Sequence, residues 1–128
     1  MATVHLESRE AAYAQTIHAG RHELVADEGP SAGGKDAGPA PYAFVLAGLA
    51  ACTSITLRMY AERKGWQLGP VHVDASFVRH GDEERIERTV KLAPGLTDEQ
   101  RSRLAEIAEK TPVTKTLRRG TPIVTRFE

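Results

Sequence analysis

Apolar residues gather in one long stretch near the middle of the chain. Between residues 42 and 57 they fall on nearly every face of a helix: Tyr42, Phe44, Val45, Leu46, Leu49, Ala50, Ile55 and Leu57. Pro41 suits the first turn of a helix, where its missing amide proton costs nothing, and Gly65 suits the end. We therefore predict a helix over Pro41–Lys64. A helix that is apolar all round has to be buried all round, and in so small a domain this favours a second subunit packed over it.

Shorter alternations of apolar and polar residues flank this stretch and predict strands. Residues 3–27 predict two or three short strands. Residues 71–79 and 85–92 alternate around a turn at residues 81–84, which predicts an antiparallel hairpin with one buried face. Residues 28–41 contain four glycines and three prolines, and this composition excludes a regular element there.

A second helix has a clear start. Thr97 and Gln100 have the spacing of a capping box, and an apolar stripe follows at Leu104, Ile107 and Ala108. This helix has to break near Thr111, because Pro112 follows it. A short turn over residues 113–117 and a final strand around residues 123–127 complete the prediction. The order of strands, helix, hairpin, helix and strand is typical of the α+β class.

Length and composition indicate one ordinary globular domain over residues 1–128. The 17 basic and 17 acidic side chains cancel, so no charge surplus points to nucleic acid or to an anionic membrane surface. Residues 37–57 lack charges, but the markedly apolar part covers only residues 42–52, too short to span a bilayer. The amino terminus does not resemble a secretory signal, and a single cysteine suits a reducing compartment. We therefore expect a cytoplasmic protein.

Cys52, the only cysteine, is the obvious candidate for chemistry. It lies about three turns into the predicted helix, where the helix dipole gives a thiolate little help. The residues alone leave two interpretations open. Free cysteines commonly pack as small apolar side chains, whereas a reactive thiolate would need an arginine or a histidine folded against it.

The histidines give no reason to expect a metal site. His18 and His22 have the four-residue spacing of ligands on a helix, but Gly20 and the strand-like surroundings remove that geometry. His72 and His80 flank the predicted hairpin, where a surface position explains both. We expect neither a metal nor another cofactor.

Residues 38–57 resemble the central helix of the OsmC/Ohr family, in which a proline eleven residues before a buried cysteine opens the helix. Pro41 and Cys52 have this spacing, and Ala, Leu and Gly fill the run between them. Residues 109–117, Glu-Lys-Thr-Pro-Val-Thr-Lys-Thr-Leu, resemble the second family motif, a Cys-Pro-Val-type turn. Residues 20–27 and 33–36 resemble the segment that leads into the helix. The resemblance spans nearly the whole chain.

The resemblance implies an intertwined homodimer, with antiparallel sheets wrapped around long central helices. It also implies thiol-dependent reduction of organic or fatty-acid hydroperoxides. In the family a cysteine that matches Cys52 is oxidised to a sulfenic acid, and a second cysteine resolves it as a disulfide that an external thiol reductant reduces. An arginine stabilises the first thiolate, and a helix glutamate holds that arginine.

This sequence departs from the family pattern at both supporting positions. Thr111 stands where the resolving cysteine is expected, and a hydroxyl cannot form a disulfide. Tyr42 and Ala43 occupy the positions expected for the glutamate. Our first candidate for the arginine is Arg9 and our second is Arg21, although both suit solvated strand edges equally well.

Three functions follow as alternatives. In the first, the chain is a one-cysteine hydroperoxide reductase that uses Cys52 in response to oxidative stress. In the second, it is a noncatalytic dimer that binds a small hydrophobic ligand such as an acyl chain. In the third, Cys52 is only a core residue and the protein has a function unrelated to that of the family. The departures at Thr111, Tyr42 and Ala43 favour the last two. The retained Cys52 favours the first, which we take as the family-level function.

Overall fold

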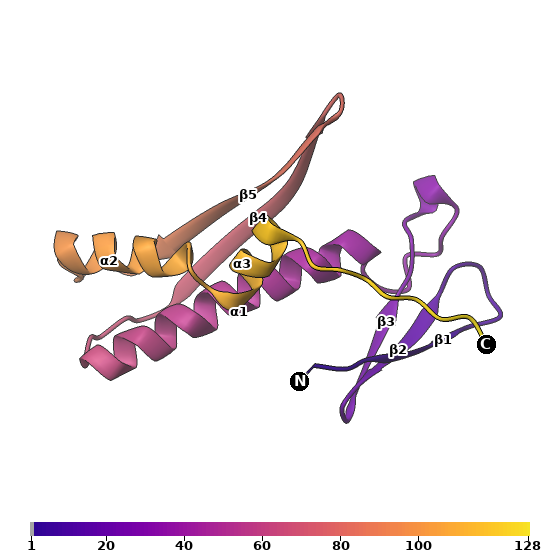
Figure 1. The fold of residues 1–128 in the computed structure, drawn as a ribbon, viewed down its shortest axis with the longest axis horizontal. Coiled ribbons are helices and arrows are strands. Elements are labelled where there is room, and N and C mark those ends of the chain that lie inside the picture. Colours follow the sequence, from indigo (N-terminus) through magenta and orange to yellow (C-terminus); the bar gives the residue numbers. More distant parts are fainter. Residues whose placement is uncertain (1) are drawn as a thin grey trace. The chain divides into compact units, whose positions relative to one another are not determined.

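The computed structural model describes residues 2–128, which form five strands, three α-helices and one 3₁₀ turn (Figure 1). The chain divides into two compact units, one ending at Val45 and one spanning Leu46–Glu128. The elements are mixed α+β, as the sequence predicted.

The amino-terminal unit contains an antiparallel sheet of three strands in the order β1-β2-β3: β1 (His5–Ser8), β2 (Gln15–Ala19) and β3 (His22–Ala26). Ala19 pairs with His22 across a two-residue turn, and Gly20 has a φ of +60°, which favours glycine. The predicted run of two or three short strands is therefore confirmed.

The segment after β3 is folded around Asp27, whose side chain is 2% exposed. Its carboxylate accepts hydrogen bonds from the backbone N–H groups of Glu28 (2.7 Å), Lys35 (3.2 Å) and Ala37 (3.1 Å). These bonds, the one from Ala37 first, lower the pKa of Asp27 against the opposing effect of burial. A 3₁₀ turn, η1 (Pro30–Ala32), is the one regular piece in a segment predicted to have none.

The long helix α1 (Pro41–Lys64) begins and ends where the sequence predicted. Its buried residues follow an i, i+4 stripe: Leu49, Thr53, Leu57 and Ala61. The prediction that the helix is buried all round is wrong for the single chain, because Ile55 and Met59 are 54% and 52% exposed. By length and composition α1 could cross a membrane, a property that core helices of soluble proteins share.

The hairpin consists of β4 (Val71–His80) and β5 (Glu83–Leu92). The predicted turn of residues 81–84 is two residues too long, because His80 pairs with Glu83 in the ladder. The φ of +61° at Gly81 allows the tighter turn. Along both strands half-buried and exposed positions alternate, as predicted for one buried face.

The capping box of α2 (Asp98–Ala108) is present: Gln100 N–H donates to Thr97 Oγ1 (3.1 Å), and Thr97 N–H donates to Gln100 Oε1 (2.9 Å). The core of this unit joins Leu57 and Ala61 of α1, Leu68 and two residues of α2, Leu104 and Ala108. It is surrounded by apolar residues of both hairpin strands.

The end of the chain differs from the prediction in two ways. Residues 113–117 form no short turn but lie in a helix, α3 (Pro112–Arg119), because Thr111 caps it and Pro112 suits its first position. The strand predicted around residues 123–127 does not form: within residues 2–128, both sheets consist of β1–β5 alone, and a strand needs a ladder of hydrogen bonds to a neighbour. Phe127 is 97% exposed there.

Candidate functional site

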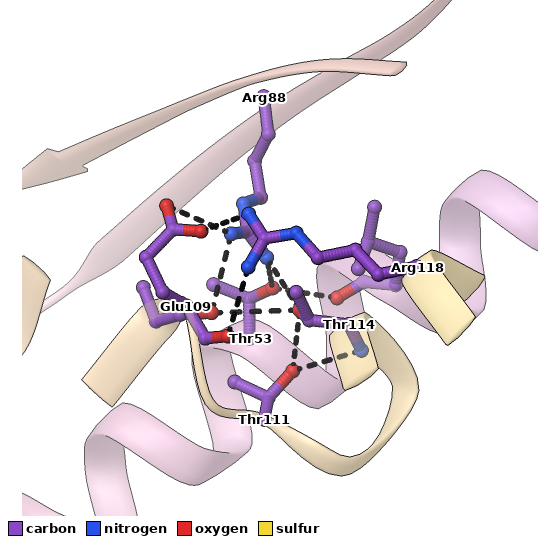
Figure 2. A network of polar contacts seen from close by, with 8 residues as sticks. Thr53, Arg88, Glu109, Thr111, Thr114 and Arg118 are labelled. Atoms are coloured by element: carbon purple, nitrogen blue, oxygen red, sulfur yellow. Dashed lines mark hydrogen bonds and ion pairs between the residues drawn. The ribbon is translucent and has the colours of Figure 1, made fainter. Parts of the chain in front are cut away.

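A largely buried arginine on β5 joins all three helices of the carboxy-terminal unit. Arg88 follows Ile86 and precedes Val90 on the half-buried face of the strand, and its side chain is 12% exposed. One guanidinium nitrogen, Nη1, donates to Thr53 Oγ1 of α1 (3.0 Å) and to Thr114 Oγ1 of α3 (2.9 Å) (Figure 2). The other, Nη2, donates to the Ala108 carbonyl at the end of α2 (3.2 Å).

The three threonines around Arg88 are buried, and each has a hydrogen-bond partner. Thr53 Oγ1 donates to the Leu49 carbonyl one turn back along α1 (2.7 Å). Thr111 Oγ1 and Thr114 Oγ1 lie 2.7 Å apart, and the Thr114 N–H donates to Thr111 Oγ1 (3.2 Å). The hydroxyl of Thr111 therefore caps α3 and closes the network below Arg88 (Figure 2).

Glu109 supplies the carboxylate of this network. Its Oε1 lies 3.7 Å from Arg88 Nη2, and its Oε2 accepts a hydrogen bond from Arg118 of α3. Arg118 also donates to the Glu109 backbone carbonyl (3.2 Å). The hydrogen bond from Arg118 lowers the pKa of Glu109 most, its charge and that of Arg88 add to this, and desolvation opposes them.

A cavity of about 420 Å³ opens beside the network. Its apolar wall comes from Leu49, Phe77, Ile86 and Leu117, one each from α1, β4, β5 and α3. Its polar lining includes Arg88, Thr114 and Arg118. A second cavity of about 310 Å³ lies toward α2, and Arg88 lines both.

Cys52 lies next to Thr53 on α1 but outside this network. Its side chain is half-buried, and its Sγ lies 3.9 Å from the Thr56 hydroxyl one turn on. Cys52 lines neither cavity. Arg88 contacts the helix that carries Cys52 through its hydrogen bond to Thr53.

The remaining predicted site residues lie in the amino-terminal unit. Arg9 donates through Nε to Thr16 Oγ1 (2.8 Å), a contact between β2 and the residue after β1, and Arg21 is exposed in the turn between β2 and β3. Tyr42 and Ala43 lie in the first turn of α1 and are exposed. Cys52 belongs to the other unit, so the pairing of Arg9 or Arg21 with its thiol stays a prediction.

Sequence reasoning singled out Thr111 but missed Arg88, Glu109, Thr114 and Arg118. The sequence contains a signal that could have identified Arg88. Arg88 interrupts the alternation of Ile86, Val90 and Leu92 on the inward face of β5, and a charged side chain on such a face needs a partner. Glu109 follows α2 as its C-cap, and Arg118 reaches it from α3, where the sequence predicted only a short turn.

A family model described as OsmC-like protein matches residues 33–126 of the chain. The chain belongs to the OsmC-like family. The matched residues include α1 with Cys52, the hairpin, both later helices and the Arg88 network, so the resemblance seen in the two sequence motifs is confirmed.

Solved structures of OsmC-like proteins have the same fold. The OsmC-like protein of Mycoplasma pneumoniae superposes with a TM-score of 0.78 at 18% identity, over 92% of this chain and 87% of that one. An organic hydroperoxide resistance protein from Elizabethkingia anophelis gives 0.72 at 19% identity, over 94% and 89%. The organic hydroperoxide resistance protein OhrB of Bacillus subtilis gives 0.64 at 21% identity, over 94% and 92%. Comparison with curated proteins gives no match.

Proposed function

We propose that this OsmC-like protein reduces organic hydroperoxides with Cys52 as its single redox cysteine and an external thiol as the resolving group. The observation that carries the proposal is the contrast between two positions. Cys52, at the family position on α1, keeps part of its side chain exposed, whereas Thr111, at the position of the second cysteine, is fully buried.

The reaction proceeds in three balanced steps. The Cys52 thiolate attacks the terminal peroxide oxygen, the O–O bond breaks, and the alkoxide leaves as an alcohol after it takes up a proton. Cys52 is then a sulfenic acid, oxidised by two electrons. A first external thiol displaces water and forms a mixed disulfide with Cys52, and a second thiol releases the cysteine and leaves as the external disulfide.

Thr111 gives the physical reason why the resolving thiol has to come from outside. Its hydroxyl cannot form a disulfide, and it already makes hydrogen bonds with the Thr114 hydroxyl and the Thr114 N–H. Cys52 is the only cysteine in the chain. An internal disulfide within one chain is therefore excluded.

The decisive test follows the consumption of an organic hydroperoxide in the presence of excess dithiol. We expect turnover by the wild type and its loss in Cys52→Ser, because an alcohol cannot take up the peroxide oxygen. Ser54→Ala, two residues along α1, serves as the matched control and keeps turnover. A wild type that consumes no more hydroperoxide than Cys52→Ser would contradict the proposal.

A second candidate function is binding of a small hydrophobic ligand without chemistry. The cavity beside Arg88 favours it, because four apolar side chains line a space of the size that small-molecule sites have. This function predicts stabilisation by the ligand that is the same in the wild type and in Cys52→Ser.

The proposal includes a homodimer of single-domain chains, located in the cytoplasm. Family membership supports the dimer, and so do the apolar side chains that α1 leaves exposed in the single chain, Ile55 and Met59. The single free cysteine supports a cytoplasmic location, because a reducing compartment keeps thiols reduced.

A further inference from the structure

The carboxy-terminal segment, residues 121–128, carries apolar side chains that the single chain leaves in water. Ile123 and Val124 are each 87% exposed, and Phe127 is 97% exposed. Ile123, Thr125 and Phe127 would share one face of a strand, but among the described residues no strand pairs with this segment. Exposed apolar side chains gathered in one place mark a contact surface. The segment therefore has the pattern of a strand that lacks its partner.

The three-stranded sheet of the amino-terminal unit has its outer edges at β1 and β3, and residues 38–39 cover the edge at β3. The Asp27 N–H, directly after β3, donates to the Pro39 carbonyl (3.1 Å). The backbone at Gly38 passes so close to β3 that a Cβ on Gly38 would overlap the Val25 carbonyl oxygen. A new strand therefore has no room beside the end of β3.

The edge of β1 is open by comparison. All four residues of β1 are exposed, and Val4 and Leu6 are 62% and 54% exposed. The Arg9 N–H points toward β2, since it donates to the Ala14 carbonyl (2.9 Å). N–H groups alternate in direction along an antiparallel strand, so those of Leu6 and Ser8 point to the open edge. An exposed apolar edge of this kind is a template for an added strand.

The net charges of the two units are opposite. The unit that ends at Val45 has six acidic and three basic residues, whereas Leu46–Glu128 has eleven acidic and fourteen basic ones. Their net charges are therefore −3 and +3. A contact between the amino-terminal unit of one copy and the carboxy-terminal unit of another is thus attractive, whereas contacts between like units are repulsive.

We propose that residues 121–128 of a second copy add to β1 as an antiparallel strand, and that the exchange is reciprocal. This contact would hold together the homodimer proposed above, on which it rests. In a two-fold dimer each chain gives its segment and receives that of the other, so both open edges are closed. Backbone hydrogen bonds to the added strand supply affinity, and the side chains set its register.

One register suits the apolar residues of both strands. It places Leu6 opposite Phe127 of the second copy. Leu6 already lies opposite Ile17 of β2, which lies opposite Leu24 of β3. Phe127 would therefore extend a row of apolar side chains on one face of the sheet, and such cross-strand pairs stabilise a sheet.

The same register suits the neighbouring residues. Glu7 lies opposite Arg126, so a carboxylate faces a guanidinium across the pair. Pro122, which has no N–H to donate, falls beyond Ser8, the last residue of β1. A shift by one residue in either direction would place a charged residue, Arg126 or Glu128, opposite Leu6.

Amide hydrogen exchange of Leu6 and Ser8, followed by NMR in the full chain, tests this contact directly. We expect both amides to exchange slowly in the dimer and quickly after dilution to the monomer, because the second copy supplies their acceptors. Rapid exchange in a protein that sediments as a dimer would overturn the proposal and leave the homodimer intact. Slow exchange that dilution does not change would also overturn it, because the segment of the same chain would then cover β1. A protein that is monomeric at every concentration contradicts the homodimer itself.

Phe127→Asp should weaken the dimer at least about tenfold, since it removes a large apolar contact and places an unpaired charge there. Phe127 is 97% exposed in the single chain, so the change leaves the fold of that chain intact. Gln67→Asp, the same new charge at an exposed residue before β4, is the matched control and should leave the dimer unchanged. Equal dissociation constants of the two variants would contradict the contact.

A charge exchange tests the register. Glu7→Arg and Arg126→Glu each place like charges opposite one another, and we expect each to weaken the dimer about threefold. The double variant restores the pair in reverse order and should recover the wild-type dissociation constant, as measured by sedimentation. A double variant that dimerises no better than either single variant would overturn the pairing of β1 with residues 121–128 in this register.

Discussion

At the scale of single residues, Arg88 links β5 to all three helices of the carboxy-terminal unit, and it was not among the residues chosen from the sequence. Its guanidinium satisfies the hydroxyls of Thr53 and Thr114 and the carbonyl of Ala108. Removing it would cost each of these buried groups one hydrogen bond and would leave Glu109 with one counterion instead of two.

We expect Arg88→Leu to lower the free energy of unfolding by about 3 kcal/mol, because buried polar partners lose their donor. Arg85→Leu, three residues earlier on β5, is the matched control. Arg85 is exposed and pairs with exposed Glu87, so its loss should change stability by about 0.5 kcal/mol or less. Urea denaturation measures both, and similar losses in the two variants would show that Arg88 does not hold the helices together.

At the scale of elements, patterns of neighbouring residues predicted most of the helices and strands correctly. The limits of α1, the alternation along the hairpin and the capping box of α2 all follow from neighbouring residues. The same reasoning missed α3, although Thr111 and Pro112 form a start signal of the same kind as the one at Thr97. Sequence reasoning also predicted a strand at residues 123–127. Apolar and polar residues alternate there, but among the described residues no strand pairs with this segment.

The loop around Asp27 gives a prediction about pH. The pKa of Asp27 is lowered below its ordinary value of 3.8, so the folded chain favours the charged form. Its contribution to stability is complete above the unfolded pKa and is lost as the pH falls through the folded pKa.

Asp27→Asn should therefore lower the melting temperature at pH 7, where the carboxylate accepts three backbone hydrogen bonds. The difference from the wild type should shrink below about pH 3.8, as the wild-type carboxyl takes up its proton. Thermal melts of both proteins between pH 3 and pH 7 measure this. A difference that stays constant across the range would mean that the charge of Asp27 contributes nothing.

At the scale of the whole molecule, the sequence predicted the family and the fold class but only part of the candidate site. Cys52 and Thr111 could be identified from the sequence because each lies in a short continuous motif, Cys52 within α1 and Thr111 at the start of α3. The contact of Arg88 with Thr53 joins residues 35 apart, and its contact with Thr114 joins residues 26 apart. Such contacts depend on the packing of β5 against helices, which periodicity does not specify.

The exposed apolar side of α1 leads to a prediction about assembly. If a second copy covers Ile55, Ile55→Glu should convert the protein from dimer to monomer, because burying an unpaired carboxylate is costly. Lys64→Glu, at the solvated end of α1, should leave the dimer intact. Sedimentation analysis distinguishes these states, and a wild type that sediments as a monomer would contradict the proposed homodimer.

The most direct test of the central claim is the intact mass of the protein after one equivalent of organic hydroperoxide and then a small thiol. We predict that Cys52 first gains one oxygen atom and then carries the thiol as a mixed disulfide, in the wild type and not in Cys52→Ser. A wild-type mass that stays unchanged while the hydroperoxide remains intact would show that Cys52 is only a packing residue of α1.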